Sequence, residues 1–426
     1  MDQQISPTPR KRWPRVLVSS LVALVIIAGI ILIIRLAILT RPVAVNTPVD
    51  ALANSNDDCV ACHRNASPGI VQQFGASQMA ANKVTCRDCH VVAANYPGAA
   101  EHEGDYILNS PTTAMCQRCH EAETAQFHQS RHALPAYVAV MGSKDLSPAQ
   151  LAQYQSIPEG SFSPNKERHI LAQMEGSDIT RFACETCHNV GKPAADGSVG
   201  QCQKCHLRHE FSLEQARKPE TCNACHIGPD HPQWEIYQES AHGIAYSVNG
   251  ATWNWSAETG TLTVKDFPAP TCATCHFSGF GGTSTTHKVG ERLTWYLFAS
   301  LSERRPSWQD NKLRMTGVCL ECHNKTFVDT FYTDADKEVA AVNGFVQQGN
   351  DIMANLTKQN LVTPAQFDEP IDYTQFELWH NWGRTAKFGA WMQGPDYTQW
   401  HGAYEMLKAI TDLKDMAAQK QQAAGK

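Results

Sequence analysis

All sixteen cysteines of this 426-residue chain belong to one repeated pattern, a Cys-x-x-Cys pair followed directly by histidine. The eight copies are Cys59–His63, Cys86–His90, Cys116–His120, Cys184–His188, Cys202–His206, Cys222–His226, Cys272–His276 and Cys319–His323. Their second cysteines are Cys62, Cys89, Cys119, Cys187, Cys205, Cys225, Cys275 and Cys322. Cys-x-x-Cys-His is the attachment signal of c-type haem, in which both thiols bond to the porphyrin and the histidine is the proximal iron ligand. The pattern therefore predicts eight c-type haems and leaves no cysteine for a disulfide or a lone nucleophile.

Zinc binding is the alternative interpretation, because paired cysteines at this spacing also form zinc knuckles. Zinc, however, does not require histidine directly after every second cysteine, and here all eight pairs have it. The pattern therefore favours haem.

The rest of the chain predicts a mainly α-helical fold with much irregular structure, because about one haem per fifty residues supplies a large part of the apolar interior. Ser147-Pro148-Ala149-Gln150 is typical of a helix start. Trp253–Val264 alternates and favours a small hairpin, and Val289–Leu301 favours a helix. After the last motif, we expect long helices over Asp334–Gln359 and Tyr373–Lys420, the second interrupted at Gly394-Pro395.

An apolar segment near the N-terminus predicts a membrane anchor. Val16–Ile34 is an uncharged run of 19 residues, and a helix of that length spans roughly 28 Å, enough to cross a bilayer. Arg10, Lys11, Arg12 and Arg15 precede it, which favours a cytoplasmic N-terminus. A cleaved signal peptide is the alternative, but its apolar region is usually shorter. We divide the chain into residues 1–41 (cytoplasmic tip and anchor), 42–58 (linker), 59–330 (octahaem-binding domain) and 331–426 (C-terminal helices).

The charge of the chain disfavours a nucleic-acid partner. The formal net charge of the chain is −6, and the first 41 residues carry +5. The remaining residues therefore carry about −11. Binding to a polyanion is unfavourable at that sign. Covalent haem and an export anchor together predict a single-pass protein of the cytoplasmic (inner) membrane, with its haem domain on the periplasmic side.

Ten histidines lie outside the motifs, and the haems need some of them as second axial ligands. They are His102, His128, His132, His169, His209, His231, His242, His287, His380 and His401. We predict that seven of them are iron ligands: His102, His132, His169, His209, His242, His287 and His380. The sequence does not assign them to particular haems.

Asp230 and His231 are the strongest candidates for acid–base chemistry. They lie in Gly228-Pro229-Asp230-His231-Pro232, where two prolines and a glycine predict a rigid turn. One interpretation is a turn-forming aspartate beside an ordinary axial ligand. The other is a proton-transferring pair over a haem with a free distal face.

Several segments resemble the octahaem hydroxylamine oxidoreductase family. They are CNACHIGPDHPQWEIYQESAHG (Cys222–Gly243), CATCHFSGFGGTSTTHKVGERLTW, VCLECHNKTFVDTFY (Val318–Tyr332) and GPDYTQWHGAYE (Gly394–Glu405). The resemblance runs from about Asp58 to Leu407 and includes all eight attachment sites in order.

This resemblance implies seven bis-histidine haems and one catalytic haem, which is attached at Cys184 and Cys187 with His188 as its proximal ligand. Asp230 and His231 match the family's distal acid–base pair. In oxidising members, a C-terminal tyrosine from a neighbouring subunit of a trimer is bonded to the catalytic haem, and Tyr404 is our candidate, with Tyr397 second. The anchor departs from typical members, which are soluble periplasmic proteins.

The resemblance implies an oxidoreductase that oxidises hydroxylamine or hydrazine, and the apolar N-terminal segment predicts that it is membrane-anchored. A second hypothesis is a nitrite or hydroxylamine reductase that forms ammonium, and a third is a non-catalytic electron conduit. The expected partners are a redox cytochrome, or a membrane cytochrome linked to quinone, and two further copies of the chain in a homotrimer.

Overall fold

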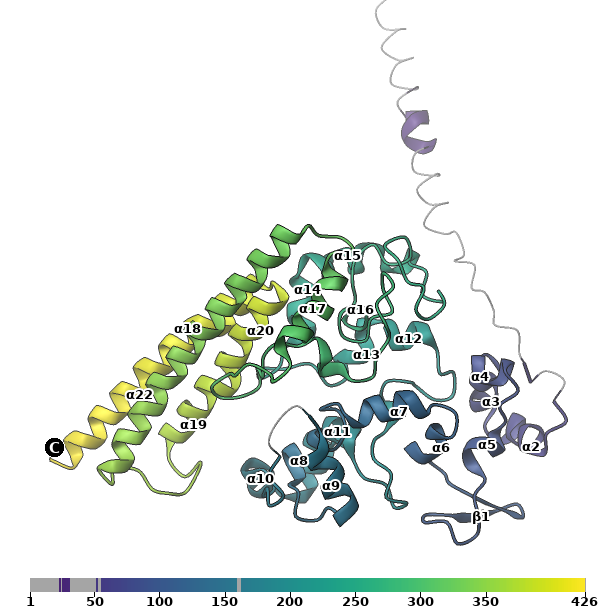
Figure 1. Ribbon diagram of the computed structural model, residues 1–426, viewed down its shortest axis with the longest axis horizontal. Helices are drawn as coiled ribbons and strands as arrows, with labels where there is room; N and C mark the ends of the chain where they lie inside the picture. Colours follow the sequence, from purple (N-terminus) through teal and green to yellow (C-terminus); the bar gives the residue numbers. More distant parts are fainter. Residues whose placement is uncertain (1–22, 24, 31–50, 53–54, 159–161, 426) are drawn as a thin grey trace, which may run out of the picture. The chain divides into compact units, whose positions relative to one another are not determined.

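The computed structural model describes residues 23, 25–30, 51–52, 55–158 and 162–425 (Figure 1). Residues Asp50–Lys426 form one compact unit and Met1–Val49 another. The predicted anchor lies mostly outside the described residues, of which 23 and 25–30 are helical. No helix among the described residues is both long and apolar enough to cross a bilayer.

Short helices joined by irregular segments build the first part of the unit. They are α2 (Asp58–Ala66), α3 (Pro68–Gly75), α4 (Gln78–Ala81), α5 (Cys86–His90), α6 (Thr113–Gln117), α7 (Glu121–His128), α8 (Leu134–Met141) and α9 (Pro148–Ser156). The only sheet among the described residues is a small antiparallel hairpin of β1 (Ala100–His102) and β2 (Asp105–Ile107), with Glu101 opposite Tyr106. The helix predicted at Ser147 is confirmed as α9, because the Ser147 hydroxyl accepts from the Gln150 amide and Pro148 is its first residue.

The middle of the chain continues in the same style. Its elements are α10 (Ile170–Phe182), α11 (Cys184–His188), η1 (Asn189–Gly191), η2 (Cys202–Lys204), α12 (Leu213–Arg217), α13 (Pro219–Asn223), α14 (Gln233–Glu239), α15 (Ala241–Asn249), η3 (Gly250–Thr252), α16 (Cys272–His276) and η4 (Val289–Arg292). The predicted mainly α-helical structure is thus confirmed, and the segments that connect the helices are irregular.

Two local predictions in this part are wrong. Val289–Leu301 is helical only in the short 3-10 turn η4, after which Trp295 bridges to Arg304 and Arg304 pairs with Asp336. Trp253–Val264 does not form a hairpin. In both segments, long-range contacts of large side chains decide the backbone path; Trp253, for example, packs in a buried aromatic cluster with Phe267.

Long helices occupy the C-terminal part (Figure 1). They are α17 (Trp308–Cys319), α18 (Lys325–Lys358), α19 (Pro370–Glu377), the π-helical turn η5 (Leu378–Gly383), α20 (Arg384–Met392), α21 (Pro395–Thr398), the π-helical turn η6 (Gln399–Ala403) and α22 (Tyr404–Ala423). Both predicted long helices are confirmed, and the second is interrupted at Gly394-Pro395 as expected, because Pro395 has no amide hydrogen to donate.

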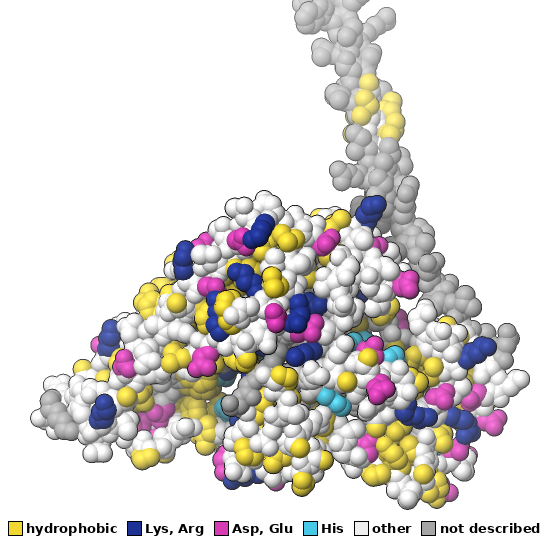
Figure 2. All heavy atoms as spheres, in the orientation of Figure 1, with side chains coloured by type: hydrophobic (Ala, Val, Ile, Leu, Met, Phe, Trp, Pro, Cys, Tyr) yellow, Lys and Arg dark blue, Asp and Glu magenta, His cyan; other side chains and the backbone are white. Residues whose placement is uncertain are grey.

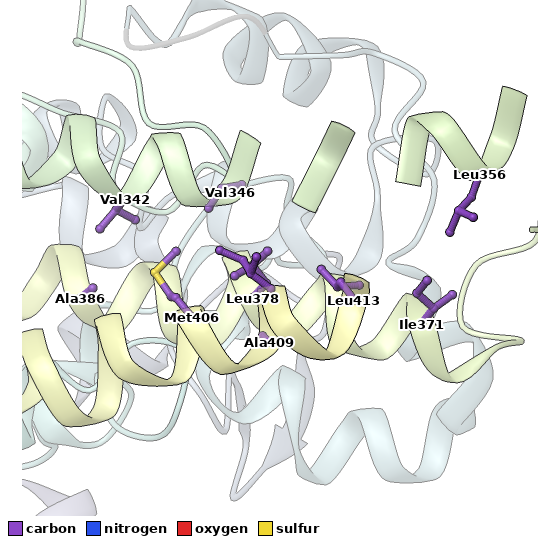
Figure 3. Close-up of a cluster of buried hydrophobic side chains, with 10 residues drawn as sticks. Val342, Val346, Leu356, Ile371, Leu378, Ala386, Met406, Ala409 and Leu413 are labelled. Carbon is purple, nitrogen blue, oxygen red and sulfur yellow. The ribbon is translucent and has the colours of Figure 1, made fainter. Parts of the chain in front are cut away.

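The periodicity of α18 explains why these helices pack together. Its buried residues recur with a spacing of three or four over most of its length: Val328, Tyr332, Ala335, Val339, Val342 and Val346. This stripe meets α20 and α22 in a core that includes Leu378, Met406 and Leu413 (Figure 3). α20 in turn packs against α14, and α14 directly follows the Gly-Pro-Asp-His turn. The helical core therefore supports the candidate site from one side.

Replacing Leu413 with alanine should destabilise this core. Leu413 is fully buried, so its loss removes apolar contacts and leaves a cavity that costs about 2–5 kcal/mol of the free energy of unfolding. Leu313→Ala, at a leucine that is 70% exposed, is the control and should change the free energy of unfolding by less than about 1 kcal/mol. Denaturant melts of the haem-loaded protein measure both, and equal effects would contradict the packing described.

Candidate haem sites and active site

The eight Cys-x-x-Cys-His motifs adopt short helical turns or lie at helix ends. α5, α11 and α16 are each one complete motif, and α17 ends at Cys319, the first cysteine of the last motif. Because helical residues three apart share a face, the two thiols of a motif point the same way. Thr85 and Thr271 cap α5 and α16 in capping boxes. The local sequence thus presents two thiols and the following imidazole together.

Histidines distant in sequence lie opposite five of the attachment histidines. The pairs and their ring-centre distances are His63–His102 at 6.0 Å, His90–His209 at 6.3 Å, His206–His287 at 6.2 Å, His226–His132 at 5.9 Å and His323–His242 at 6.0 Å. Two imidazoles whose nitrogens each lie about 2 Å from one metal ion would have ring centres about 6 Å apart. These residues therefore fit bis-histidine haem.

Two further observations support that fit. A histidine that binds metal usually donates its other ring nitrogen to a carbonyl, and Nδ1 of His90 and of His188 lie 2.7 Å from the carbonyls of Leu108 and Ala136. Nε2 is then the nitrogen that remains for iron. Leu207 and Ile227, each directly after an attachment histidine, are exposed apolar side chains, as expected beside a large apolar group.

The attachment sites, numbered one to eight in chain order, lie next to one another. Thiols of successive sites along this series hydrogen-bond or affect each other's pKa: Cys59 and Cys86, Cys89 and Cys119, Cys116 and Cys202, Cys205 and Cys222, Cys222 and Cys272, and Cys275 and Cys319. This connects sites one, two, three, five, six, seven and eight. Site four lies beside site six through Cys187 and Cys225, and beside site five through the Lys204 ammonium, which donates to the Thr186 carbonyl at 3.0 Å.

Three attachment histidines, His120, His188 and His276, have no histidine ring against them among the described residues. The structure also does not place His169 or His380, both predicted to be ligands, against an attachment histidine. Nδ1 of His169 accepts from the Leu171 amide at the start of α10. His169 also lines a cavity of about 290 Å³ with Phe376 and Trp379.

His188 is distinguished by the acid–base pair beside it. Burial lowers the pKa of His188, and His231 and Asp230 are both close enough to affect it further. Asp230 and His231 are joined by a 2.5 Å hydrogen bond from Nδ1 to Oδ1, and each is about one quarter exposed. The structure thus brings together the three residues that the sequence analysis assigned to one site.

Their mutual contact sets the charge of the pair. Burial alone would lower the pKa of His231, but the hydrogen bond and the negative charge of Asp230 outweigh it and raise the pKa above 6.5. Burial would raise the pKa of Asp230, but His231, His380 and Arg384 keep it below its usual value. The contact therefore stabilises the protonated form of His231 and the ionised form of Asp230.

Arg384, at the start of α20, is a site residue that sequence reasoning missed. Its Nη1 lies 3.3 Å from Oδ2 of Asp230 and donates to Nε2 of His380 at 2.9 Å. Burial lowers the pKa of His380 to about 4, so this histidine is neutral and accepts. Nδ1 of His380 donates to the Asn381 side chain at 3.1 Å, so both of its nitrogens have partners. Asp230 and Arg384 are 154 positions apart in the sequence, so no local signal could have linked them.

Tyr404 and Tyr397 lie away from this pair in the chain. Tyr404 is the first residue of α22, is 48% exposed and contacts Trp400. The ring of Tyr397, in α21, lies 4.8 Å from the ring of His401 in a tilted arrangement, and His401 pairs with Asp396 at 3.1 Å. His128, the remaining histidine, lies with Nε2 3.1 Å from the Val199 carbonyl. Histidine side chains reach the surface on the face shown in Figure 2.

Comparison with known proteins gives the family. A model described as "Seven times multi-haem cytochrome CxxCH" matches residues 82–370, which hold the second to the eighth motif. A curated protein of Kuenenia stuttgartiensis, described as a probable nitrite reductase-hydroxylamine oxidoreductase fusion protein, is 29% identical over 365 residues. That match covers 74% of this chain and 39% of the relative, so the chain spans about two fifths of the relative's length.

Two solved structures share the fold. A hypothetical multiheme protein superposes with a TM-score of 0.74 at 21% identity, covering 86% of this chain and 96% of that one. A reducing HAO-like protein complex of Kuenenia stuttgartiensis gives 0.66 at 19% identity, covering 86% and 85%. The family model matches more than half of the chain, and the repeated motifs and the paired histidines agree with it. The chain therefore belongs to the multihaem c-type cytochromes, and its fold is similar to that of the reducing HAO-like complex.

Proposed function

We propose that this protein is an octahaem oxidoreductase that converts a small nitrogen compound at attachment site four. The observation that carries the proposal is the Asp230–His231 pair beside His188. Cys184, Cys187 and His188 would hold the haem there, and that haem would supply the redox-active iron to which a substrate nitrogen binds.

The chain's own residues manage protons in this proposal. Each electron removed from hydroxylamine or hydrazine is accompanied by proton release, and each electron added to nitrite by proton uptake. His231 holds or gives up a proton at its ring nitrogens, while Asp230 fixes the ring through Nδ1. The adjacent attachment sites would pass the electrons onward.

The first candidate reaction is oxidation of hydroxylamine or hydrazine, which the family resemblance favours. Reduction of nitrite or hydroxylamine to ammonium is the second candidate, and the positive charge of Arg384 against Asp230 favours it because nitrite is an anion. Steady-state assays with hydroxylamine, hydrazine and nitrite, each with matched artificial acceptors or donors, separate the two directions.

Carbon monoxide tests whether the protein is an enzyme or a conduit. The dithionite-reduced, haem-loaded protein should bind CO, because CO needs an iron with a free coordination position and a bis-histidine haem offers none. The measurement is the CO difference spectrum with its stoichiometry per chain. A spectrum unchanged by CO would contradict the proposed enzyme and support a non-catalytic conduit.

The proposal extends to assembly and location. Tyr404 is exposed at the start of α22, where a second chain could reach it, so we propose it as the residue crosslinked to a neighbouring subunit's haem in a homotrimer. Denaturing mass analysis tests this. The segment Val16–Ile34 would anchor the protein in the inner membrane with its haems in the periplasm, where a cytochrome or a quinone-linked membrane cytochrome exchanges electrons with it.

A further inference from the structure

Contacts through Nε, Nη1 and the face of the guanidinium fix Arg384 beside the acid–base pair. Its side chain is only 12% exposed. Nε donates to the Phe298 carbonyl at 3.0 Å, and Nη1 reaches both Asp230 and His380. The guanidinium carbon also lies 5.3 Å from the ring centre of Phe298 and 5.1 Å from that of Trp379. A planar, five-donor group is thereby held in one orientation at the site.

The Arg384 guanidinium shares its carboxylate partner with a second side chain. Burial lowers the pKa of Arg384 to about 10, which still leaves it protonated at neutral pH. Asp230 is the carboxylate that it contacts, and Asp230 is shared with His231, whose pKa that same carboxylate raises. One carboxylate therefore contacts both the Arg384 guanidinium and the His231 ring.

One donor of Arg384 remains for a ligand. Among the described residues, Nε and Nη1 have acceptors, and Nη2 makes no hydrogen bond. His380 is neutral, and both of its ring nitrogens already have hydrogen-bond partners, so it does not take a proton from the pair. An oxygen of a small anion would find a free N–H of a charged guanidinium here.

We propose that Arg384 positions Asp230 against His231 and selects a small oxyanion of the nitrite class over an uncharged ligand such as hydroxylamine. The inference rests on the proposed function, because it names the substrate class of that same site. Arg384 acts here as a positioning and specificity-determining residue: it holds the carboxylate through Nη1 and offers Nη2 to the anion.

The test measures the equilibrium Kd of the ferric, haem-loaded protein for sodium nitrite and, separately, for hydroxylamine. Optical titration gives both constants. Arg384→Gln should raise the Kd for nitrite about 10- to 100-fold, as expected when one partner of a buried charge interaction is removed, and change that for hydroxylamine by less than about 3-fold. Arg384→Lys, which keeps the charge but not the fork, should recover part of the nitrite affinity. Arg314→Gln, at an exposed arginine on α17, is the matched control and should leave both constants unchanged.

Three outcomes overturn the inference. Equal weakening of both ligands by Arg384→Gln would mean a structural role, or a contact with a haem propionate, instead of anion selection. A Kd for nitrite that is unchanged in Arg384→Gln would overturn this inference and leave the proposed function standing. If the unsubstituted protein binds neither ligand, the proposed function fails and the inference fails with it. Haem content and melting temperature, measured on every variant, exclude misfolding as the cause of a loss.

Discussion

The double variant Cys184→Ser and Cys187→Ser is expected to lose catalysis with every nitrogen substrate, at least about 1,000-fold, because the redox chemistry belongs to the cofactor held at that motif. It should also lose CO binding by the reduced protein. Without the two thioether bonds no haem is fixed over His188, and the Asp230–His231 pair then faces no iron. The measurements are turnover with the substrate that the unsubstituted protein uses, and the CO difference spectrum.

The matched control for this variant is Cys319→Ser and Cys322→Ser, which removes attachment site eight instead. Both variants should lose a single haem by pyridine haemochrome and by mass. The control should keep its CO spectrum, since His323 lies 6.0 Å from His242 and forms a complete axial pair. Retained CO binding after loss of site four would place the open iron elsewhere, with His120 and His276 as the next positions to examine.

Asp230→Asn should lower kcat by about 100- to 10,000-fold, the usual contribution of a positioned acid or base. An amide keeps the shape of the side chain but removes the charge that raises the pKa of His231. It also removes the negative partner of Arg384. Substrate binding and haem content should change far less than kcat. Asp334→Asn, at an exposed aspartate paired with Lys337, is the control and should retain full activity.

The pH profile gives an independent check on Asp230. The folded pKa of His231 lies above 6.5, so the imidazole keeps its proton to higher pH than a free histidine and loses it as the pH rises through that raised value. A reduction that takes a proton from His231 should therefore fall on the alkaline side. In Asp230→Asn, that alkaline limb should move to lower pH. An unchanged profile would show that His231 does not supply the proton.

Sequence reasoning succeeded where the signal is local. The motifs, the capped helix at Ser147, the long α18 and the interruption at Pro395 each depend on residues within a few positions of one another. The acidic turn was likewise visible, because Asp230 and His231 are adjacent.

It failed where distant side chains decide the structure. His90 and His209 meet across 119 residues, and nothing in either neighbourhood specifies the other. The sequence does not distinguish His380 from the other histidines outside the motifs. In the structure, Arg384 and Asn381 are hydrogen-bond partners of its two ring nitrogens. The segment after η4 looked helical, but the contacts of Trp295, Arg304 and Asp336 hold it in an irregular path.

The position of site four determines which attachment sites receive its electrons first. Site four lies beside sites five and six, within a series whose ends are sites one and eight. Electrons released at site four would reach sites five and six, from which the series leads toward site one and toward site eight. The two ends could serve different redox partners, and the sites along both arms could store several electrons between encounters. A multi-electron reaction could then run to completion without waiting for a partner to arrive at each step.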